Sequence, residues 1–461
     1  MRQLFGTDGI RGIAGTAPLD IRTVYAVGLA LAHQLRPAAL QSGQLSSSLG
    51  PKVILGRDTR ESSPWIANLL AAGLRSGGAE VESAGIVPTP AIAHLAHTHK
   101  FHAGVVISAS HNPWEDNGFK LFGPDGKKLP DQTELAIEEI IFKHAIATAP
   151  PELDSLPPVD DQPHYAQEYV DFLLAAVPGL NLAGLKIVVD CANGAASTIA
   201  PALFSKLGGD VTLLNASPDG RNINDHCGAL HPKTVAAEAL ERGANLGITF
   251  DGDADRCLFS GAHNNVINGD AILLMAARDL QARGLLTGGL VVATTMSNMG
   301  LEAALKRSGI AMLRAAVGDR YVLELMQQKR AALGGEQSGH ILFPHLATTG
   351  DGLLTALVVL DLLVRTGKTI EELTADLKVF PQVIVNVKVR EKKPLDSIPA
   401  VAERIRAAET ELADSGRVVI RYSGTEALAR VMIEAESEEA MRRHADAIAD
   451  AIRAELGTPP E

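Results

Sequence analysis

Cysteine, net positive charge and long apolar runs are all scarce in this chain, and each shortage excludes a class of protein. The 461 residues include three cysteines, whose spacing fits neither a disulfide framework nor a metal-binding motif: Cys191, Cys227 and Cys257. The formal net charge of −12 lacks the basic excess of a general nucleic-acid binder. The sequence therefore favours a globular protein of a reducing compartment, in which any anionic substrate is bound by a few local arginines.

Apolar segments long enough to span a bilayer are also missing. The longest, at 353–364, is interrupted by Thr355 and Asp361 and is too short to cross a membrane. The first residues, MRQLFGTDGIRG, lack the apolar centre of a signal peptide. We therefore expect a soluble, cytoplasmic protein without a membrane or nucleic-acid partner.

Strand-like and helix-like segments alternate along most of the chain. Three short runs rich in β-branched residues, at 53–55, 187–189 and 290–292, each lead into a polar loop, a helical segment, a glycine and another strand. Glycine at the end of a helix tolerates the left-handed conformation required there. The pattern favours three α/β domains of similar build, although such units are common in any α/β protein.

After Pro381 the pattern changes to that of a smaller α+β domain of about 80 residues. Strands are expected at 383–389, 417–422 and 429–434, and helices at 400–413 and 438–456. A segment rich in Pro, Asp and Ser at 148–163 reads as a linker. A chain of this length exceeds one core, and we predict four domains, at 1–160, 161–265, 266–380 and 381–461.

Three aspartates at alternate positions give the strongest chemical signal: Asp251, Asp253 and Asp255. They follow the apolar segment 246–250, so they are expected at the carboxyl end of a strand, where ligand sites of α/β proteins form. An EF-hand begins with the same spacing, but Arg256 replaces its turn glycine and Ala262 its final glutamate. Three carboxylates with a phosphoryl oxygen suit Mg²⁺, and a solvated acidic turn is the alternative.

A second signal is the SASHNP segment at 108–113, which follows the apolar run 103–107. It predicts a buried strand that presents the hydroxyl of Ser110 on a tight turn. A hydrolase nucleophile is one interpretation, but the Gly-x-Ser-x-Gly elbow is absent. A phosphorylated serine would need positive charge, which a metal at the aspartates, Arg11, His111 and Lys120 could supply. Taken alone, His111 reads better as a residue that caps the turn.

Other segments combine glycine with polar side chains. RYSGTE at 421–426 offers an arginine and a backbone nest for a phosphate, with a plain hairpin turn as an equal alternative. GGEQSGH at 334–340 could bind sugar hydroxyls or be a satisfied turn, and FGTDGIRG at 5–12 contributes Arg11. GRDTR at 56–60 could support the same cleft or cap the next helix.

Five of these motifs, FGTDGIRG, SASHNP, DGDADR, GEQSGH and RYSGTE, occur in this order along nearly the whole chain. Together they resemble the α-D-phosphohexomutase superfamily. The resemblance implies three α/β domains with mixed sheets and a smaller C-terminal α+β domain of the TATA-binding-protein type around a central cleft. Gln337, VGDRYV at 317–322 and TTGDG at 348–352 are most similar to members that act on glucosamine phosphates.

The resemblance also implies residue roles. Ser110 would be the phosphoserine intermediate, and Mg²⁺ would be held by Ser110, Asp251, Asp253 and Asp255. The other catalytic residues would be His111, Lys120, Arg11 and His340, with Lys120 and His340 as candidates for proton transfer. Substrate would be bound by Glu336, Ser338, Arg421, Ser423, Gly424, Thr425 and Arg430. Two residues depart from the pattern, because Tyr422 stands where lysine is frequent and Ala427 where proline is common.

The implied reaction interconverts glucosamine 6-phosphate and glucosamine 1-phosphate through glucosamine 1,6-bisphosphate, and would feed UDP-N-acetylglucosamine and cell-wall precursor synthesis. A phosphomannomutase or phosphoglucomutase of the same superfamily is the nearer alternative. A metal-dependent sugar-phosphate phosphatase and a non-catalytic sensor are more distant ones. The expected partner is a small sugar phosphate, and a homodimer is left open.

Overall fold

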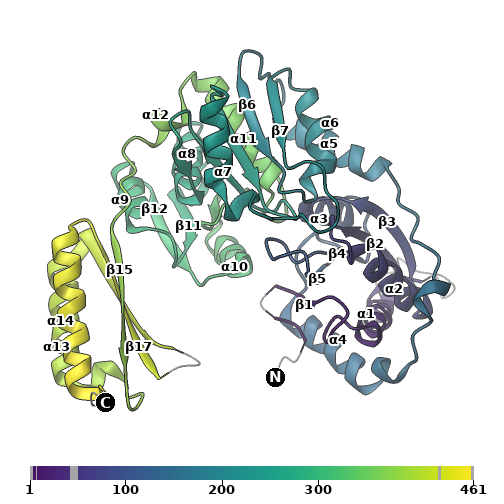
Figure 1. The fold of residues 1–461 in the computed structure, drawn as a ribbon, viewed down its shortest axis with the longest axis horizontal. Helices are drawn as coiled ribbons and strands as arrows, with labels where there is room; N and C mark the ends of the chain where they lie inside the picture. The colour runs from purple at the N-terminus through teal and green to yellow at the C-terminus, as the bar shows by residue number, and fades with distance from the viewer. Residues whose placement is uncertain (1–3, 7, 42–49, 424–426, 458–461) are drawn as a thin grey trace. The chain divides into compact units, whose positions relative to one another are not determined.

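The computed structural model describes residues 4–6, 8–41, 50–423 and 427–457. Its contacts divide the chain into two compact units. The first unit contains 1–295 and 314–373, and the second contains 296–313 and 374–461. Figure 1 shows the strands and helices of each in order along the colour scale. In the part of the chain that is described, no helix combines the length and apolar character needed to cross a membrane.

The first three sheets repeat one strand order: β5-β4-β2-β3, β9-β8-β6-β7 and β14-β13-β11-β12. Their strands, with β1 and β10 added at two edges, are β1 (Ile10–Ile13), β2 (Lys52–Arg57), β3 (Glu80–Ile86), β4 (Ala103–Ile107), β5 (Asp116–Phe122), β6 (Lys186–Asp190), β7 (Asp210–Leu214), β8 (Leu246–Phe250), β9 (Cys257–Ser260), β10 (Val266–Ile267), β11 (Leu290–Thr294), β12 (Ala311–Ala315), β13 (Gly334–Gly335) and β14 (Ile341–Leu342). Parallel pairs lie at the centre, and an antiparallel hairpin follows in each sheet. The expected repetition of α/β units with mixed sheets is confirmed.

Helices connect the strands of these sheets: α1 (Ile21–Gln41), α2 (Ser63–Ser76), α3 (Thr89–Thr98), α4 (Asp131–Lys143), α5 (His164–Ala176), α6 (Ala196–Ser205), α7 (Pro232–Glu241), α8 (Gly269–Ala282), α9 (Met299–Arg307), α10 (Asp319–Lys329), α11 (Gly352–Thr366) and α12 (Ile370–Thr374). The glycines expected after three of them adopt left-handed φ values of 84° at Gly78, 75° at Gly208 and 70° at Gly309. Glycine reaches this region without the steric cost of a Cβ atom, so each helix can turn back into the next strand.

Strand alternation explains how helices cover both faces of the first sheet. Val53 and Leu55 belong to the same buried cluster as residues of α1, α2 and α4. On the opposite face, a Cβ atom at Gly56 or Gly104 would lie within 2.8 Å of Ile92 of α3. Successive side chains of a strand point to opposite faces, so the two glycines let α3 approach the sheet closely.

The hairpins place three turns at equivalent positions in the three sheets. The turn between β4 and β5 carries 108–115, the turn between β8 and β9 carries 251–256, and the turn between β13 and β14 carries 336–340. These are the SASHNP, DGDADR and GEQSGH motifs. One architectural position, used three times, therefore presents the residues that the sequence singles out.

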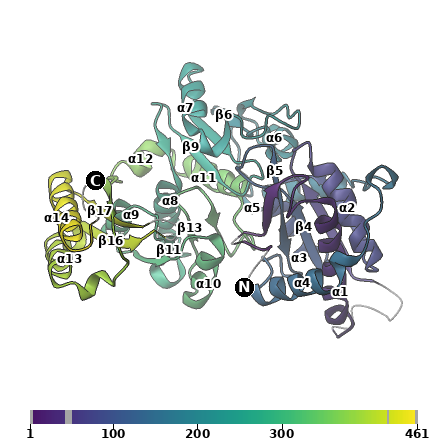
Figure 2. The same cartoon turned by 60° about the horizontal axis from the view of Figure 1, so that its bottom comes forward.

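The second unit contains an antiparallel sheet of order β15-β17-β16. Its elements are β15 (Gln382–Lys388), α13 (Pro399–Leu412), β16 (Gly416–Tyr422), β17 (Leu428–Ala435) and α14 (Glu438–Leu456). One sheet face packs on α13 and α14 (Figures 1 and 2), with Val387, Val431 and Ile448 in its core. The elements expected after Pro381 are confirmed, including the last helix with its predicted bounds.

The segment predicted as a linker, 148–163, is attached to the first sheet near the segment's C-terminal end. Both terminal guanidinium nitrogens of Arg57 donate to Asp161, at 2.8 and 2.7 Å, and the hydroxyl of Ser83 donates to the same carboxylate at 2.7 Å. The low hydrophobicity of 148–163 indicated a connection between domains, but it did not reveal that Asp161 would anchor that connection to the first sheet.

Candidate active site

The serine turn and the aspartate loop meet. Ser110 Oγ donates a hydrogen bond to Asp251 Oδ2 at 2.6 Å, although the two residues are 141 positions apart in the sequence. Ser110 follows β4 and Asp251 follows β8, and both are buried. The two motifs thus form one site within the first unit.

The three aspartates form a compact group of buried oxygen atoms. One carboxylate oxygen from each lies within 4.8 Å of the others. Burial, followed by the charges of Asp255 and Asp253, raises the pKa of Asp251 to about 8. Among the described residues, Asp253 Oδ1 is buried without a hydrogen-bond partner. An unsatisfied buried carboxylate oxygen is costly, so this donor set fits a hard divalent cation.

Lys120 lies beside the aspartates on β5. Its Nζ atom donates to Asp253 Oδ2 at 2.6 Å and to Asp255 Oδ2 at 3.0 Å, and it lies 3.6 Å from Asp8. Burial alone would lower the pKa of Lys120, but these three carboxylates outweigh it and raise the pKa well above the usual range. Lys120 is therefore a fixed positive charge that can donate a proton in this state but cannot accept one.

Two histidines at the site differ in charge. His111 Nδ1 lies 3.2 Å from Ser110 Oγ, and burial, with smaller effects of Arg256 and Arg11, lowers its pKa to about 4. His340 lies 3.5 Å from both Asp255 and Asp319. Burial would lower the pKa of His340, but Asp255 above all raises it to about 9. At neutral pH, His111 is therefore neutral and His340 is a cation. The positive charge that a phosphate on Ser110 would need must come from groups other than His111.

The residues expected to recognise the sugar lie on the turn between β13 and β14. Ser338 Oγ donates to Glu336 Oε2 at 3.3 Å, and the Gly318 N–H donates to Glu336 Oε1 at 3.0 Å. Both turn residues are half-buried, so they remain accessible to a ligand. Gln337 donates to Asp270 at 3.1 Å and thereby ties the turn to α8.

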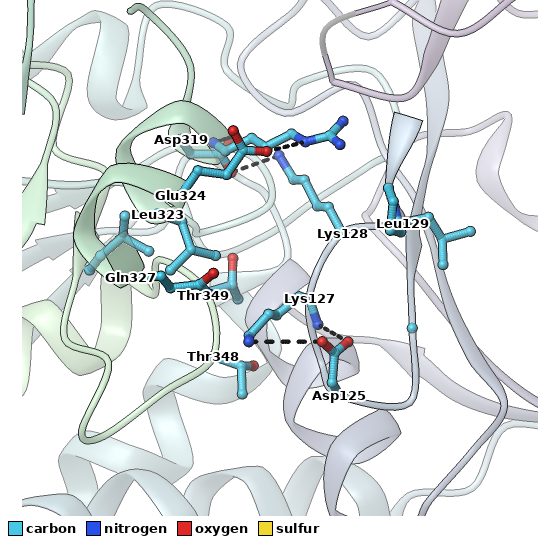
Figure 3. Close-up of a pocket in the computed structure, with 14 residues that line it drawn as sticks. Asp125, Lys127, Lys128, Leu129, Asp319, Leu323, Glu324, Gln327, Thr348 and Thr349 are labelled. Atoms are coloured by element: carbon cyan, nitrogen blue, oxygen red, sulfur yellow. Dashed lines mark hydrogen bonds and ion pairs between the residues drawn. The ribbon is translucent and has the colours of Figure 1, made fainter. Parts of the chain in front are cut away.

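A half-buried ion-pair network, which the motif analysis missed, extends from this site. Asp8 pairs with Arg11 and Lys128, and Lys128 also pairs with Asp319 at 2.7 Å. Lys120, Lys128 and Arg11 overcome the effect of burial and lower the pKa of Asp8. Both residues line a cavity of about 280 Å³, to which the loop after β5 and α10 contribute. Figure 3 shows the ends of the Lys128 and Asp319 side chains pointing toward each other. Asp8 stands in FGTDGIRG and Asp319 in VGDRYV, so the motifs contained a signal for both residues.

The predicted phosphate loop belongs to the second unit. Arg421 on β16 and Arg430 on β17 are directly opposite each other, an arrangement that is unfavourable for like charges and suits an anion between or beside them. Ser423 is buried, and its N–H donates to the Leu428 carbonyl at 2.8 Å. The predicted Gly424 and Thr425 lie outside the described residues.

Lys392 is a second residue that the motifs did not reveal. Its Nζ atom donates to the Ser423 carbonyl at 2.6 Å, which holds an ammonium group at the end of β16. Tyr422, which stands where lysine is frequent, instead donates from its hydroxyl to the Lys393 carbonyl at 2.5 Å. The segment after β15 therefore provides a cation beside the loop that Tyr422 itself does not.

Four consecutive stretches of the chain match the domains of phosphoglucomutase/phosphomannomutase. The matches are alpha/beta/alpha domain I at 2–147, domain II at 167–264, domain III at 268–380 and the C-terminal domain at 384–451. The phosphoglucosamine mutase of Koribacter versatilis is 56% identical over 464 residues, which cover 99% of this chain and 98% of that protein. The phosphoglucosamine mutase of Solibacter usitatus is 49% identical over 456 residues, which cover 99% of both chains.

The chain belongs to the phosphoglucosamine mutases. It is therefore an isomerase of the phosphohexomutase superfamily, and the resemblance drawn from the five motifs is confirmed. A phosphoglucomutase/phosphomannomutase family protein from Burkholderia thailandensis has the same fold, with a TM-score of 0.77, 25% identity and 98% of each chain covered. The predicted domain boundaries and the residue roles within this phosphoglucosamine mutase fold stay predictions.

Proposed function

We propose that this phosphoglucosamine mutase interconverts glucosamine 6-phosphate and glucosamine 1-phosphate with Ser110 as the phosphoryl carrier. The observation that supports this most directly is the 2.6 Å hydrogen bond from Ser110 Oγ to Asp251 within the buried group of three aspartates. A hydroxyl used only to cap a turn would have no reason to face three carboxylates. A hydroxyl that becomes a phosphate monoester would face them because the phosphate and the carboxylates can then bind the same cation.

Asp251, Asp253 and Asp255 would hold Mg²⁺ together with an oxygen of phosphorylated Ser110, and when bound the ion supplies positive charge to the phosphoryl oxygens. The chain adds further positive charge through Lys120 and Arg11. The close pairing of Lys120 with two of the aspartates keeps its charge at the site. Charge neutralisation of this kind, with positioning, is the main contribution of proteins to phosphoryl transfer.

In the first transfer, the bond between Ser110 Oγ and phosphorus breaks, and a bond forms between phosphorus and the free hydroxyl oxygen of the sugar. The proton of that hydroxyl leaves, and Ser110 Oγ regains one. Neutral His111, the base nearest to Ser110 Oγ, is proposed to accept the proton of the sugar hydroxyl. His340 and Lys120, both protonated here, are the proposed donors of the proton that Ser110 Oγ regains. In the second transfer, the other phosphate of the 1,6-bisphosphate returns to Ser110 by the same exchange.

The sugar would be recognised by Glu336 and Ser338. The phosphate that is not transferred would be bound by Arg421, Ser423, Gly424, Thr425 and Arg430. Facing arginines favour this role because guanidinium groups form strong, charge-assisted hydrogen bonds with phosphate. A mutase needs two such anion sites, because each phosphate of the bisphosphate occupies both during one turnover.

A coupled assay on the 6-phosphates of glucosamine, glucose and mannose tests the reaction and the sugar preference together. We expect the highest kcat/KM for glucosamine 6-phosphate. The Ser110→Ala variant, incubated with substrate and a bisphosphate primer, is expected to show no turnover, whereas the exposed Ser205→Ala variant retains full activity. Stoichiometric release of inorganic phosphate would instead identify a phosphatase, and normal turnover by Ser110→Ala would refute the proposal.

A further inference from the structure

The peptide groups of Ser110 are fixed on both sides by side chains that lie away from the proposed phosphoryl group. Ser110 has a left-handed φ of 54°, a conformation that is unfavourable for a residue with a side chain. Its N–H donates to Ser108 Oγ at 2.9 Å. Its carbonyl accepts from Arg60 Nη2 and from Asn224 Nδ2, both at 2.9 Å. Such a conformation persists only where the surroundings over-determine it.

The guanidinium group of Arg60 binds the main-chain carbonyls of the serine turn. The fully buried guanidinium donates to the carbonyls of Asn112 and Asp116, at 2.9 Å each, and also to that of Pro113. The turn directs these carbonyls inward, where water cannot satisfy them. Only arginine offers enough donors in one plane to bind several carbonyls at once.

Asp58 balances the charge of Arg60 and connects it to the other side of Ser110. Its Oδ2 accepts from Arg60 Nε at 2.8 Å and from Ser108 Oγ at 2.6 Å, and both side chains of the ion pair are fully buried. The hydroxyl of Ser108 then accepts from the Ser110 N–H. One buried ion pair therefore controls the peptide before Ser110 and the peptide after it.

Asn224 extends this support from the second α/β domain. Its amide nitrogen donates to the carbonyls of Ser110 and Asn112, at 2.9 and 3.1 Å. The contact requires Gly252 in the aspartate loop, because a Cβ atom there would lie 2.5 Å from the Ser110 carbonyl oxygen and 2.8 Å from Asn224 Nδ2. The serine turn is therefore seated directly on the loop that would carry the metal.

We propose that Arg60 and Asn224 are positioning residues for phosphoryl transfer, which hold Ser110 Oγ at the aspartates while the phosphoryl group leaves and returns. The inference rests on the proposed function of Ser110. The charge on the serine side chain changes twice in each turnover, and a turn held only through that side chain would shift with it. Contacts to main-chain carbonyls do not change with phosphorylation. A displacement of about 1 Å at a reacting atom can cost about 100-fold in rate, so this support has a measurable effect on kcat.

The test compares Asn224→Ala with Asn215→Ala. Both asparagines have left-handed φ values, 59° and 46°, and both donate from Nδ2, but Asn215 donates to Asp190 rather than to the serine turn. In the full-length enzyme with Mg²⁺, we expect Asn224→Ala to lower kcat at least about tenfold with KM unchanged within about twofold. Asn215→Ala should lower Tm about as much as Asn224→Ala does but keep kcat within about twofold of wild type.

Three further variants separate geometry from stability. Asn224→Asp, which turns a carboxylate oxygen toward two carbonyls, should lower kcat below that of Asn224→Ala. Arg60→Lys, which keeps the charge but loses the planar set of donors, should lower kcat. Arg57→Lys, which loses a two-pronged ion pair with Asp161 instead of contacts with the serine turn, should not. If Arg60→Lys does not fold, the Asn224 series decides alone.

The positioning role is refuted if Asn224→Ala keeps kcat within about twofold of wild type, or if Asn215→Ala loses as much. Wild-type enzyme is measured in the same series, by intact mass for phosphorylated Ser110 and by turnover of glucosamine 6-phosphate. Wild-type enzyme without a phosphoserine would overturn the proposed function and this inference together. Wild-type phosphorylation with an unaffected Asn224→Ala variant overturns this inference alone.

Discussion

The serine turn and the phosphate loop after β16 are proposed to bind the same chemical group, but they are built in opposite ways. Ser110 is 2% exposed, and its carbonyl and those around it are held by Arg60 and Asn224. Arg421 is exposed on the open sheet face, with Arg430 opposite it. The difference fits the two proposed tasks, because a covalent carrier must return to one position, whereas a binding loop must accept two different phosphates and release both.

This contrast predicts that substitutions at the serine turn change kcat and that substitutions at the phosphate loop change KM. The largest effect is expected for Asp253→Asn, which removes a carboxylate at the proposed metal and breaks its contacts with Lys120 and with the Thr89 hydroxyl at 2.5 Å. We expect kcat to fall at least about 100-fold. Steady-state kinetics at saturating Mg²⁺ measure this, with the half-exposed Asp361→Asn on α11 as control. A purely KM effect would break the comparison.

The next largest effect is expected for Arg421→Met, which should change KM instead of kcat. A hydrogen bond to a charged group contributes roughly 1.5–3 kcal/mol, so KM for glucosamine 6-phosphate should rise about 10- to 100-fold. Arg442→Met, which removes an exposed ion pair on α14 in the same unit, should leave KM unchanged. Substrate titration of both variants measures this. An Arg421→Met enzyme with wild-type KM would show that the facing arginines do not bind the phosphate.

A smaller effect on KM, also at the phosphate loop, is expected for Lys392→Met. Lys392 is an exposed residue, so its attraction for a phosphate is screened by solvent and salt. We expect KM to rise about threefold at low ionic strength and less at high salt. Lys393→Met, which alters the neighbouring side chain but keeps the carbonyl that accepts from Tyr422, is the matched control. An equal effect of both variants would argue for a general charge effect rather than a role of Lys392.

The smallest effect on activity, and a clear one on stability, is expected at the buried Asp351. Burial raises the pKa of its carboxyl to about 6, although it accepts hydrogen bonds from the Tyr169 hydroxyl at 2.8 Å and from the Leu354 N–H at 2.9 Å. The folded state therefore binds this proton more tightly than the unfolded state. Its stabilisation is complete below about pH 4 and is lost as the pH rises through about 6.

Asp351→Asn resembles the protonated carboxyl at every pH. Between pH 4 and pH 7.5, the free energy of unfolding of the variant should therefore gain on the order of 2 kcal/mol relative to wild type. Urea denaturation at the two pH values measures the difference. A difference of the opposite sign would show that the carboxylate is stabilised in the folded protein.

Residues at strand ends were predictable, and residues that act on the main chain were not. The apolar runs at 103–107 and 246–250 located β4 and β8, and thereby Ser110 and the three aspartates. Arg60 was predicted only as part of a segment that could support the cleft. Its partners are four main-chain carbonyl oxygens, which every residue carries and which a side-chain pattern therefore cannot indicate. Asn224 lies in a loop without periodicity, and its partner is 114 positions away. The sequence likewise contains no signal that pairs Lys392 with Ser423.

The use of equivalent hairpin turns has a consequence for the biosynthesis of the enzyme. Ser110 leaves the ribosome long before Asp251 and Asn224, so the first domain alone has a serine turn without the aspartates proposed to hold the metal and without the amide of Asn224. A nascent or truncated chain therefore lacks the groups that would make Ser110 a phosphoryl carrier. On the proposed roles, activity requires that the first two α/β domains have both folded and docked.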